Sequence, residues 1–447
     1  MAITPAPKLP DVSKGQALYR KARRLVPGAT QLFGKRAELY LPEHWPAYYS
    51  KAKGCRIWDI DNNEYLDFTM CGIGTSVLGY ADPDVEQAVI AAIQSCNMTT
   101  LNCPEEIELA ELLCELHPWA EKVRYARTGG EIMAVAVRIA RAATGRDKIA
   151  LCGYHGWHDW YLAVNLGSAD VLSGHLLPGL EPRGVPGCLR GTVLAFGYNK
   201  LEELEKIVQE RGSELAAIVM EPMRNDGPAP GFLEGVRTLA KKAGAVLIFD
   251  EITSGWRMGT CGMHRIYGVD PDMATFAKAM SNGFPMSAVI GRGEIMDYAQ
   301  RTFISSSYWT EKSGPAAALA TLKKHRRINA GKFLTTRGET VQKGWRQAAE
   351  SAGLNIKVSG IPPLTSFSFL HDDPLALQTY FIQEMLSRGF LASDRFYASC
   401  AHGDAETRLY LNAVTEVFAL ITNAMKSGGV RQKLKGPVKL AAFTRLS

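Results

Sequence analysis

The sequence predicts an α/β protein built on a large, doubly wound and mostly parallel β-sheet. Two observations lead to this prediction. In the middle of the chain, short apolar runs alternate with longer, helix-like segments over roughly 200 residues, the order expected of repeated β–α units. Each apolar run is continuous instead of alternating with polar residues, which is typical of strands that helices cover on both faces. The region after residue 330 mixes helices with short strands and predicts a smaller α+β domain.

The individual elements follow from local patterns. A hairpin is expected at 56–68, around the turn-forming residues Asp61, Asn62 and Asn63. One helix should end at Gly244, since glycine is a favourable helix stop. The expected strands are 122–126, 148–152, 216–220, 245–249 and 287–291, and the expected helices are 131–143, 201–210, 232–244 and 373–389.

The composition and the apolar segments of the sequence bear on the cellular location of the protein. Hydrophobic residues make up 46% and charged residues 21% of the 447 residues, a balance typical of soluble globular proteins. No apolar run is long enough to span a bilayer, and the start, MAITPAPKLPDVSKG, lacks the apolar block of a secretory signal. We therefore expect a cytoplasmic protein with no membrane partner.

The formal net charge of +6 raises the question of an acidic partner. No acidic residue follows Glu416, whereas six basic residues do, so the excess charge lies in a basic tail, 426–447. This tail is either a disordered arm or a docked segment. No basic patch interleaved with aromatic residues is present, so a solvated tail is favoured and no nucleic-acid partner is predicted.

Residues directly after the predicted strands are candidates for a ligand site, because ligands in open α/β sheets gather at the carboxyl ends of strands. Lys278 is the only charged residue in the stretch 274–291, where a solitary ammonium is costly to bury. Asp250 ends the apolar run 245–249 and is either a helix cap or the partner of a buried cation. Glu221 follows another predicted strand in the same way.

Two further strand ends carry polar or aromatic residues. After 122–126, Thr128, Gly129 and Gly130 form either an anion site for a phosphate or a plain helix entry. After 148–152, Tyr154 either stacks on a flat ligand or packs in the ordinary way.

A metal site is a third possibility after the same strand. His155, His158 and Asp159 lie close together in the sequence. Two ring nitrogens at i and i+3 do not make a metal site without further clustered ligands, so no metal is predicted.

Together these features match the requirements of pyridoxal 5′-phosphate. They comprise a phosphate cradle, a stacking aromatic residue, a buried aspartate and a solitary lysine 28 residues after it. Lysine forms a Schiff base with the cofactor's aldehyde, so Lys278 is not left as an isolated ammonium. An aspartate holds the pyridine nitrogen protonated, which makes the ring an electron sink.

The sequence resembles a known family, the class III pyridoxal-phosphate aminotransferases, and within it the glutamate-1-semialdehyde aminomutase-like branch. The likeness runs from about Gln16 to about Ile421 and rests on motifs in family order. RTGGE is similar, through Glu131, to the phosphate motif SGTEA. The other matching segments are GCRIWDIDNNEYLDF, VLGYADPDV, YHG, Glu221-Pro222, LIFDEITSGWRMG, FAKAMSNGFPMSAVIGR and YWTEKSGPAAALATL.

The resemblance implies pyridoxal-phosphate fold type I, in which a large cofactor domain is joined by a small domain from both termini. It implies a homodimer. We place the N-terminal part of the small domain at 1–60, the large domain at 61–328, the C-terminal part of the small domain at 329–425 and the basic tail at 426–447.

The resemblance also assigns roles by position. Lys278 is implied to be the Schiff-base lysine and proton shuttle, and Asp250 the partner of the pyridine nitrogen. Tyr154 and Ile252 would cover the two faces of the ring. Thr310 would reach the phosphate of the neighbouring subunit. The implied cofactor-binding residues are Thr128, Gly129, Gly130, Tyr154, His155, Glu221, Asp250, Ile252, Lys278 and Thr310, of which Lys278, Asp250 and Tyr154 are catalytic.

Several positions depart from the family pattern. Ile132 replaces the alanine after the glutamate of the phosphate motif, and SNG replaces GGG after the lysine. Thr253 stands where the family has a glutamine or methionine, and the glutamine would contact the cofactor's phenolic oxygen. The segment 31–38 lies where the aminomutase carries an arginine, and either Lys35 or Arg36 would replace that arginine.

Three functions remain in competition at this stage. The first is an aminotransferase that moves an amino group from a small-molecule amine donor to a ketone or aldehyde acceptor, such as a sugar or a natural-product intermediate. The second is an aminomutase that shifts an amine within one molecule. The third is a non-catalytic binding protein on the same fold, which the presence of Lys278 and Asp250 argues against.

Overall fold

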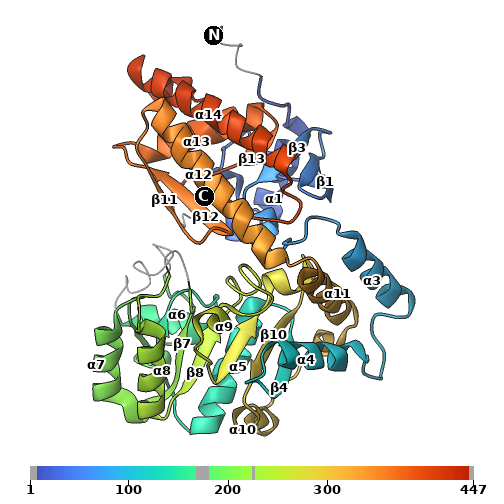
Figure 1. The fold of residues 1–447 in the computed structure, drawn as a ribbon, viewed down its shortest axis with the longest axis vertical. Coiled ribbons are helices and arrows are strands. Elements are labelled where there is room, and N and C mark those ends of the chain that lie inside the picture. Colours follow the sequence, from blue (N-terminus) through green and yellow to red (C-terminus); the bar gives the residue numbers. More distant parts are fainter. Residues whose placement is uncertain (1–7, 168–180, 224–226, 442–447) are drawn as a thin grey trace. The chain divides into compact units, whose positions relative to one another are not determined.

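The computed structural model describes residues 8–167, 181–223 and 227–441, which form two compact units (Figure 1). The sheet unit runs from Pro83 to Lys332. The terminal unit contains the chain up to Asp82 and from Phe333 onward. The first boundary therefore lies later than the expected one after residue 60, because 61–82 belongs to the terminal unit.

The sheet unit is built around a seven-stranded sheet. Only β10 runs antiparallel to its two neighbours, so the expected mostly parallel sheet is confirmed. In sheet order the strands are β4 (Lys122–Ala126), β10 (Ser287–Gly291), β9 (Met273–Phe276), β8 (Val246–Asp250), β7 (Leu215–Met220), β5 (Lys148–Cys152) and β6 (Val193–Ala195).

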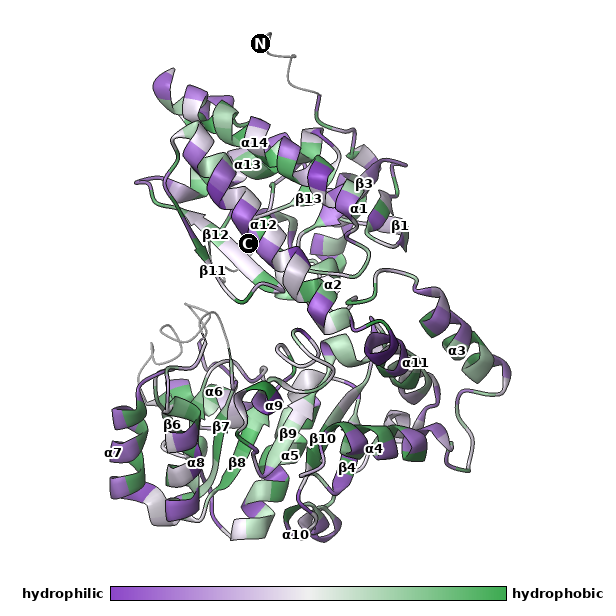
Figure 2. Ribbon diagram, in the orientation of Figure 1, coloured by the Kyte–Doolittle hydropathy of each residue, from purple (hydrophilic) through white to green (hydrophobic). Residues whose placement is uncertain are grey.

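Helices cover both faces of this sheet, and successive residues of a strand serve opposite faces. Ile248 of β8 packs in a cluster with α5 (Gly129–Thr144). Its neighbours Leu247 and Phe249 pack instead with α7 (Leu201–Arg211) and α8 (Phe232–Ala243). Figure 2 shows β7 and β8 in hydrophobic colours, whereas α7 and α8 carry hydrophilic residues as well. This alternation explains why the strands read as continuous apolar runs.

Other helices of the sheet unit frame its remaining edge. The helix α11 packs against α3 and α4, with exposed ion pairs such as Arg326–Glu115 between them. The remaining helices of this unit are α3 (Pro83–Gln94), α4 (Glu105–Leu116), α6 (Asp159–Leu162), α9 (Met263–Tyr267), α10 (Gly293–Met296) and α11 (Ser313–Arg327).

The terminal unit combines two small sheets with helices from both ends of the chain. One sheet has the order β1-β2-β3-β13 and the other β11-β12-β14. Stacked aromatic rings of Phe68, Phe396 and Tyr410 form part of its core. The strands are β1 (Tyr49–Lys53), β2 (Arg56–Asp59), β3 (Glu64–Phe68), β11 (Ile356–Ser359), β12 (Leu364–Phe369), β13 (Phe390–Ala392) and β14 (Arg395–Tyr397). The helices are α1 (Ser13–Leu25), α2 (Cys71–Gly74), α12 (Ala330–Ala352, which begins in the sheet unit), α13 (Pro374–Ser387) and α14 (Asp404–Lys426).

The described part of the basic tail is docked on the terminal unit. The backbone N–H of Lys435 donates to Gln383 Oε1 at 2.7 Å, and that of Leu440 donates to the Glu38 carbonyl at 2.7 Å. Residues 427–441 are therefore a bound segment, and the solvated tail favoured from the sequence does not describe them. Among the described residues, no helix has the length and apolarity needed to cross a bilayer.

Candidate active site

Strand direction brings the predicted site residues to one edge of the seven-stranded sheet. The strands β7, β8 and β9 are parallel neighbours, and Asp250 pairs with Thr275. Because parallel strands end at the same edge, Glu221 after β7, Asp250 at the end of β8 and Lys278 after β9 all lie there.

The outer strands add residues to the same edge. Tyr154 and His155 follow β5, which is parallel to β7. The antiparallel strand β10 begins at this edge, since its Ser287 pairs with Ala126 at the end of β4. The hydroxyl of Ser287 donates to the Thr128 carbonyl at 3.0 Å, which fixes the start of α5.

Lys278 is held in a strained and partly buried position. Its backbone φ is 45°, in the left-handed region that side chains other than glycine rarely adopt, at a cost of about 1–3 kcal/mol. Its Nζ donates to Thr253 Oγ1 at 2.7 Å. Burial is the main cause that lowers the pKa of the Lys278 amine, and the Arg257 guanidinium adds to it, whereas Asp250 and Glu221 oppose it.

Arg257 and Lys278 both contact Thr253. The buried Arg257 donates from Nε to the Thr253 carbonyl at 3.0 Å, on the residue whose hydroxyl accepts from Lys278. Thr253 therefore connects the side chains of Arg257 and Lys278, although the sequence suggested only a lost contact at this position.

Asp250 and His155 form a buried pair. The Nδ1 atom of His155 lies 2.8 Å from Asp250 Oδ2, and its Nε2 lies 3.1 Å from the Cys152 carbonyl. Asp250 Oδ1 accepts the backbone N–H of Ile252 at 3.0 Å. Both ring nitrogens of His155 therefore face oxygen atoms, one on the Asp250 carboxylate and one on the Cys152 carbonyl.

Tyr154, Glu221 and Ile252 complete this part of the edge. The backbone N–H of Tyr154 donates to Glu221 Oε2 at 3.3 Å. Burial is the main cause that raises the pKa of the Tyr154 phenol, followed by the charges of Asp250 and Glu221. Tyr154 and Ile252 are both partly buried against the core cluster beside α5.

The N-terminus of α5 is a complete capping box. Thr128 is the N-cap, and its Oγ1 accepts the Glu131 N–H at 3.4 Å. Glu131 Oε2 accepts the backbone N–H groups of Thr128 at 2.9 Å and Arg127 at 3.2 Å. The glutamate thus turns back on the residues before the helix, and a ligand can reach the N–H groups of the glycine turn.

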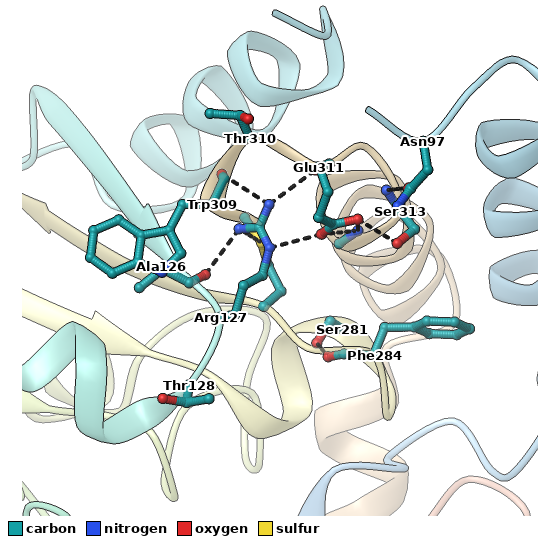
Figure 3. Close-up of polar contacts among 12 residues, drawn as sticks. Asn97, Ala126, Arg127, Thr128, Ser281, Phe284, Trp309, Thr310, Glu311 and Ser313 are labelled. Atoms are coloured by element: carbon teal, nitrogen blue, oxygen red, sulfur yellow. Dashed lines mark hydrogen bonds and ion pairs between the residues drawn. The ribbon is translucent and has the colours of Figure 1, made fainter. Parts of the chain in front are cut away.

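A buried ion pair ties this helix entry to the segment that carries Thr310 (Figure 3). Arg127 Nε lies 2.8 Å from Glu311 Oε1, and its Nη2 donates to the carbonyls of Trp309 and Glu311 at 2.9 Å each. Glu311 also accepts the Gly314 N–H at the start of α11 at 2.9 Å. Thr310 is exposed, and its hydroxyl donates to the Ser307 carbonyl at 2.9 Å. The pair therefore sets the relative positions of the loops carrying Thr128 and Thr310.

A second buried network lies behind the residue that follows Asp250. Glu251 Oε1 accepts from the backbone N–H and Nδ1 of His264, both at 2.8 Å. His117, stacked on His264, accepts the Gly262 N–H at Nε2 and donates from Nδ1 to the Leu113 carbonyl. Burial and the neighbouring His264 lower the pKa of His117 to about 4, so this ring is neutral near pH 7.

Sequence reasoning gave no role to several residues that shape this edge. Arg127 and Glu311 form an ion pair although they lie 184 residues apart in the sequence, and no local pattern predicts such a pair. His158, considered only as a metal ligand, lies beside Gly130. Among the described residues, no group of three histidine, cysteine, aspartate or glutamate side chains could hold a metal ion.

The fold and the residues at this edge of the sheet point to one class of enzyme. A comparison of the sequence with known families identifies that class. A sequence profile of the family described as aminotransferase class-III matches residues 41–366, well over half of the chain. The protein therefore belongs to the class-III aminotransferases. The expected enzyme class, fold type I and cofactor, pyridoxal 5′-phosphate, are confirmed for the family to which it belongs.

Curated relatives with two kinds of activity are similar to most of the chain. The 3-aminobutyryl-CoA aminotransferase of Cloacimonas acidaminovorans (strain Evry) is 31% identical over 370 residues, covering 81% of this chain and 85% of the relative. The glutamate-1-semialdehyde 2,1-aminomutase of Desulforamulus reducens is 33% identical over 437 residues, covering 92% and 98%.

Among solved structures, the FumI protein of Sphingopyxis sp. MTA144 is similar with a TM-score of 0.85. The match covers 94% of this chain and all of that one at 24% identity, so the likeness bears on the fold alone.

Proposed function

We propose that this aminotransferase transfers an amino group from a small-molecule amine donor to a ketone or aldehyde acceptor at a site centred on Lys278. The state of this side chain carries the proposal. Within the described part of the chain, its amine forms no ion pair, donates to the hydroxyl of Thr253 and has a lowered pKa. A lowered pKa favours the neutral amine, the form that attacks carbonyl carbon and accepts protons.

The residues at this edge fit pyridoxal 5′-phosphate. The Lys278 amine suits its aldehyde, the buried Asp250 carboxylate suits its ring nitrogen, and the N-terminal turn of α5 suits its phosphate. Gly129 must stay free of a side chain, because a Cβ added there would lie 3.1 Å from Ile252. When bound, the cofactor supplies an electron sink for the charge left on the substrate carbon after loss of a proton.

Lys278 is proposed to move that proton. Its neutral Nζ takes the proton from the substrate carbon and returns it, and the lowered pKa keeps a larger fraction of the amine neutral near pH 7. Thr253 holds the nitrogen between these steps through the 2.7 Å hydrogen bond.

Asp250 is proposed to hold the ring nitrogen in its protonated form. One carboxylate oxygen is oriented by His155 and the other by the Ile252 N–H, so the group is fixed before the cofactor binds. Such fixed orientation costs no reorganisation during the reaction. Tyr154 and Ile252 are proposed to cover the two ring faces, and Glu221, which accepts the Tyr154 N–H, to lie close by.

The phosphate is proposed to bind at the start of α5, through Thr128 and the N–H groups of Gly129 and Gly130. We further propose a homodimer in which the exposed Thr310 reaches the phosphate of the neighbouring subunit. A cytoplasmic location stays a prediction.

An intramolecular aminomutase is the second candidate, because an aminomutase relative is 33% identical over 92% of this chain. The two activities differ in one observable. An aminotransferase releases a carbonyl product from the donor when a separate acceptor is present, whereas an aminomutase needs no separate acceptor.

The test uses purified protein with added cofactor. Borohydride reduction followed by peptide mass mapping identifies the lysine that holds the cofactor, and a panel of amines with one carbonyl acceptor is screened for carbonyl products. We expect Lys278→Ala to abolish the labelled peptide and the transfer. Lys439→Ala is the control, since burial also lowers the pKa of Lys439. A label on another lysine contradicts the assignment.

A further inference from the structure

The loop after β5 packs directly on the first turn of α5. A Cβ added at Gly156 would lie 3.1 Å from the Gly130 Cα, and Gly156 has a φ of 102°. Glycine at both positions allows the two backbones to approach this closely. The loop that carries His155 is therefore in contact with the proposed phosphate site.

His158 occupies the space beside Gly130. A Cβ added at Gly130 would lie 3.0 Å from His158 Cδ2 and 3.1 Å from its Nε2. The neighbouring Trp157 ring lies against the imidazole, with 4.6 Å between ring centroids. Any larger residue at Gly130 would have to displace the imidazole.

The Nε2 atom of His158 lacks a protein partner. It is buried and has no hydrogen bond to any described residue. Buried polar atoms in native proteins are nearly always hydrogen-bonded, so an exception is a candidate position for a ligand, an ion or a water. This atom lies beside the helix turn whose N–H groups favour an anion.

The sequence gives a reason for a histidine here. When 128–131 is aligned on Glu131 with the motif SGTE, Gly130 stands at the threonine position. The chain therefore lacks a hydroxyl that the family motif provides, and the His158 imidazole fills the volume that this threonine would need.

We propose that His158 binds the cofactor's phosphate through Nε2–H and replaces the hydroxyl missing at Gly130. This inference rests on the proposed function, which puts the phosphate at the start of α5. A phosphate oxygen accepts from Nε2–H and so satisfies the buried nitrogen. Histidine and glycine thus act as a pair, and changing either one alone should weaken binding of the phosphate.

Binding to cofactor-free protein tests the contact without measuring activity. Dissociation constants are measured for pyridoxal 5′-phosphate and for pyridoxal, which lacks the phosphate. For His158→Phe we expect about tenfold to hundredfold weaker binding of pyridoxal 5′-phosphate and unchanged binding of pyridoxal. His158→Gln, which keeps a donor, should lose less, and His371→Phe, at an exposed histidine of the terminal unit, should lose nothing.

A second pair of variants tests the exchange. Gly130→Thr alone should weaken pyridoxal 5′-phosphate binding because the new Cβ meets His158. Gly130→Thr combined with His158→Ala should recover most of the lost affinity, because the clash is removed and the threonine hydroxyl takes the place of the imidazole.

The outcomes separate the two proposals. If the unmodified protein binds pyridoxal 5′-phosphate no better than pyridoxal, no phosphate site exists and both proposals are overturned. If it prefers the phosphorylated form and His158→Phe weakens both ligands alike or neither, only the role of His158 is overturned.

Discussion

Replacing Arg127 with methionine should destabilise the sheet unit strongly, because Arg127 and Glu311 form a buried ion pair that joins two of its loops. The side chains are only 9% and 11% exposed. Without the guanidinium, the Glu311 carboxylate stays buried with Ser313 and Gly314 as its remaining donors, and the Trp309 carbonyl loses its donor. Breaking a buried pair by removing one partner costs about 3–5 kcal/mol.

An exposed pair in the same unit provides the control. Arg326 and Glu115 lie 2.7 Å apart, but their side chains are 48% and 63% exposed. Pairs of this kind contribute about 0–1 kcal/mol, so Arg326→Met should be nearly neutral.

Guanidinium unfolding of the four proteins of a double-mutant cycle measures the interaction. Glu311→Gln keeps acceptor and donor groups for the neighbouring contacts, and it should cost less than Arg127→Met. The double variant should cost less than the sum of the single ones, with a coupling energy of about 1–3 kcal/mol. If Arg127→Met is no more destabilising than Arg326→Met, the reasoning from burial is refuted.

Two further predictions concern protonation. Thr253→Val should lower the pKa of Lys278 further, because an ammonium loses more than an amine when its acceptor is removed, and Thr253→Ser should keep it. The pH dependence of Lys278 acylation in cofactor-free protein measures this, and an unchanged or raised pKa would contradict it. Stability should fall between pH 6.5 and 4 by about 3 kcal/mol on account of His117 alone, because its ring stays neutral in the folded state down to about pH 4 while the unfolded chain takes up a proton. His117→Gln should flatten the fall in denaturation midpoint with pH, and an equally steep fall would count against the assignment.

The central sheet could be predicted from sequence because its signal is local. Strands at 122–126, 148–152 and 287–291 coincide with β4, β5 and β10. Their continuous apolar runs reflect burial on both faces, which depends little on the rest of the chain. The direction of β10 could not be read in the same way, since a run covered on both faces looks alike whichever way it is paired.

The boundary of the terminal unit was harder, for a physical reason. The strand β3 pairs in parallel with β13, more than 300 residues later in the sequence. Such pairing decides to which unit 61–82 belongs, and it leaves no mark on the local pattern. The docked tail has the same origin, since its contacts with Gln383 and Glu38 involve distant residues.

The site shows the same division between local and distant signals. Asp250 and Lys278 stand out because a charge ends or interrupts an apolar run. Thr253 drew notice only as a departure from a family pattern, and its bond to Lys278 depends on how β8 and β9 are paired. The role proposed for His158 depends on its unpartnered nitrogen beside Gly130, and no pattern in the sequence brings these two residues together.

The arrangement of charges matters because the proposed site places a lysine with a lowered pKa and an anion at one edge of a sheet. A nearby anion would raise the pKa of Lys278 and work against a neutral amine. The proposed phosphate site follows β4, which is two strands from β9 in the sheet, or about 10 Å at normal strand spacing. There the phosphate charge would meet the N–H groups of α5, whereas Arg257 lowers the pKa of Lys278. In the proposed site, separate strand ends thus keep the phosphate charge away from the Lys278 amine.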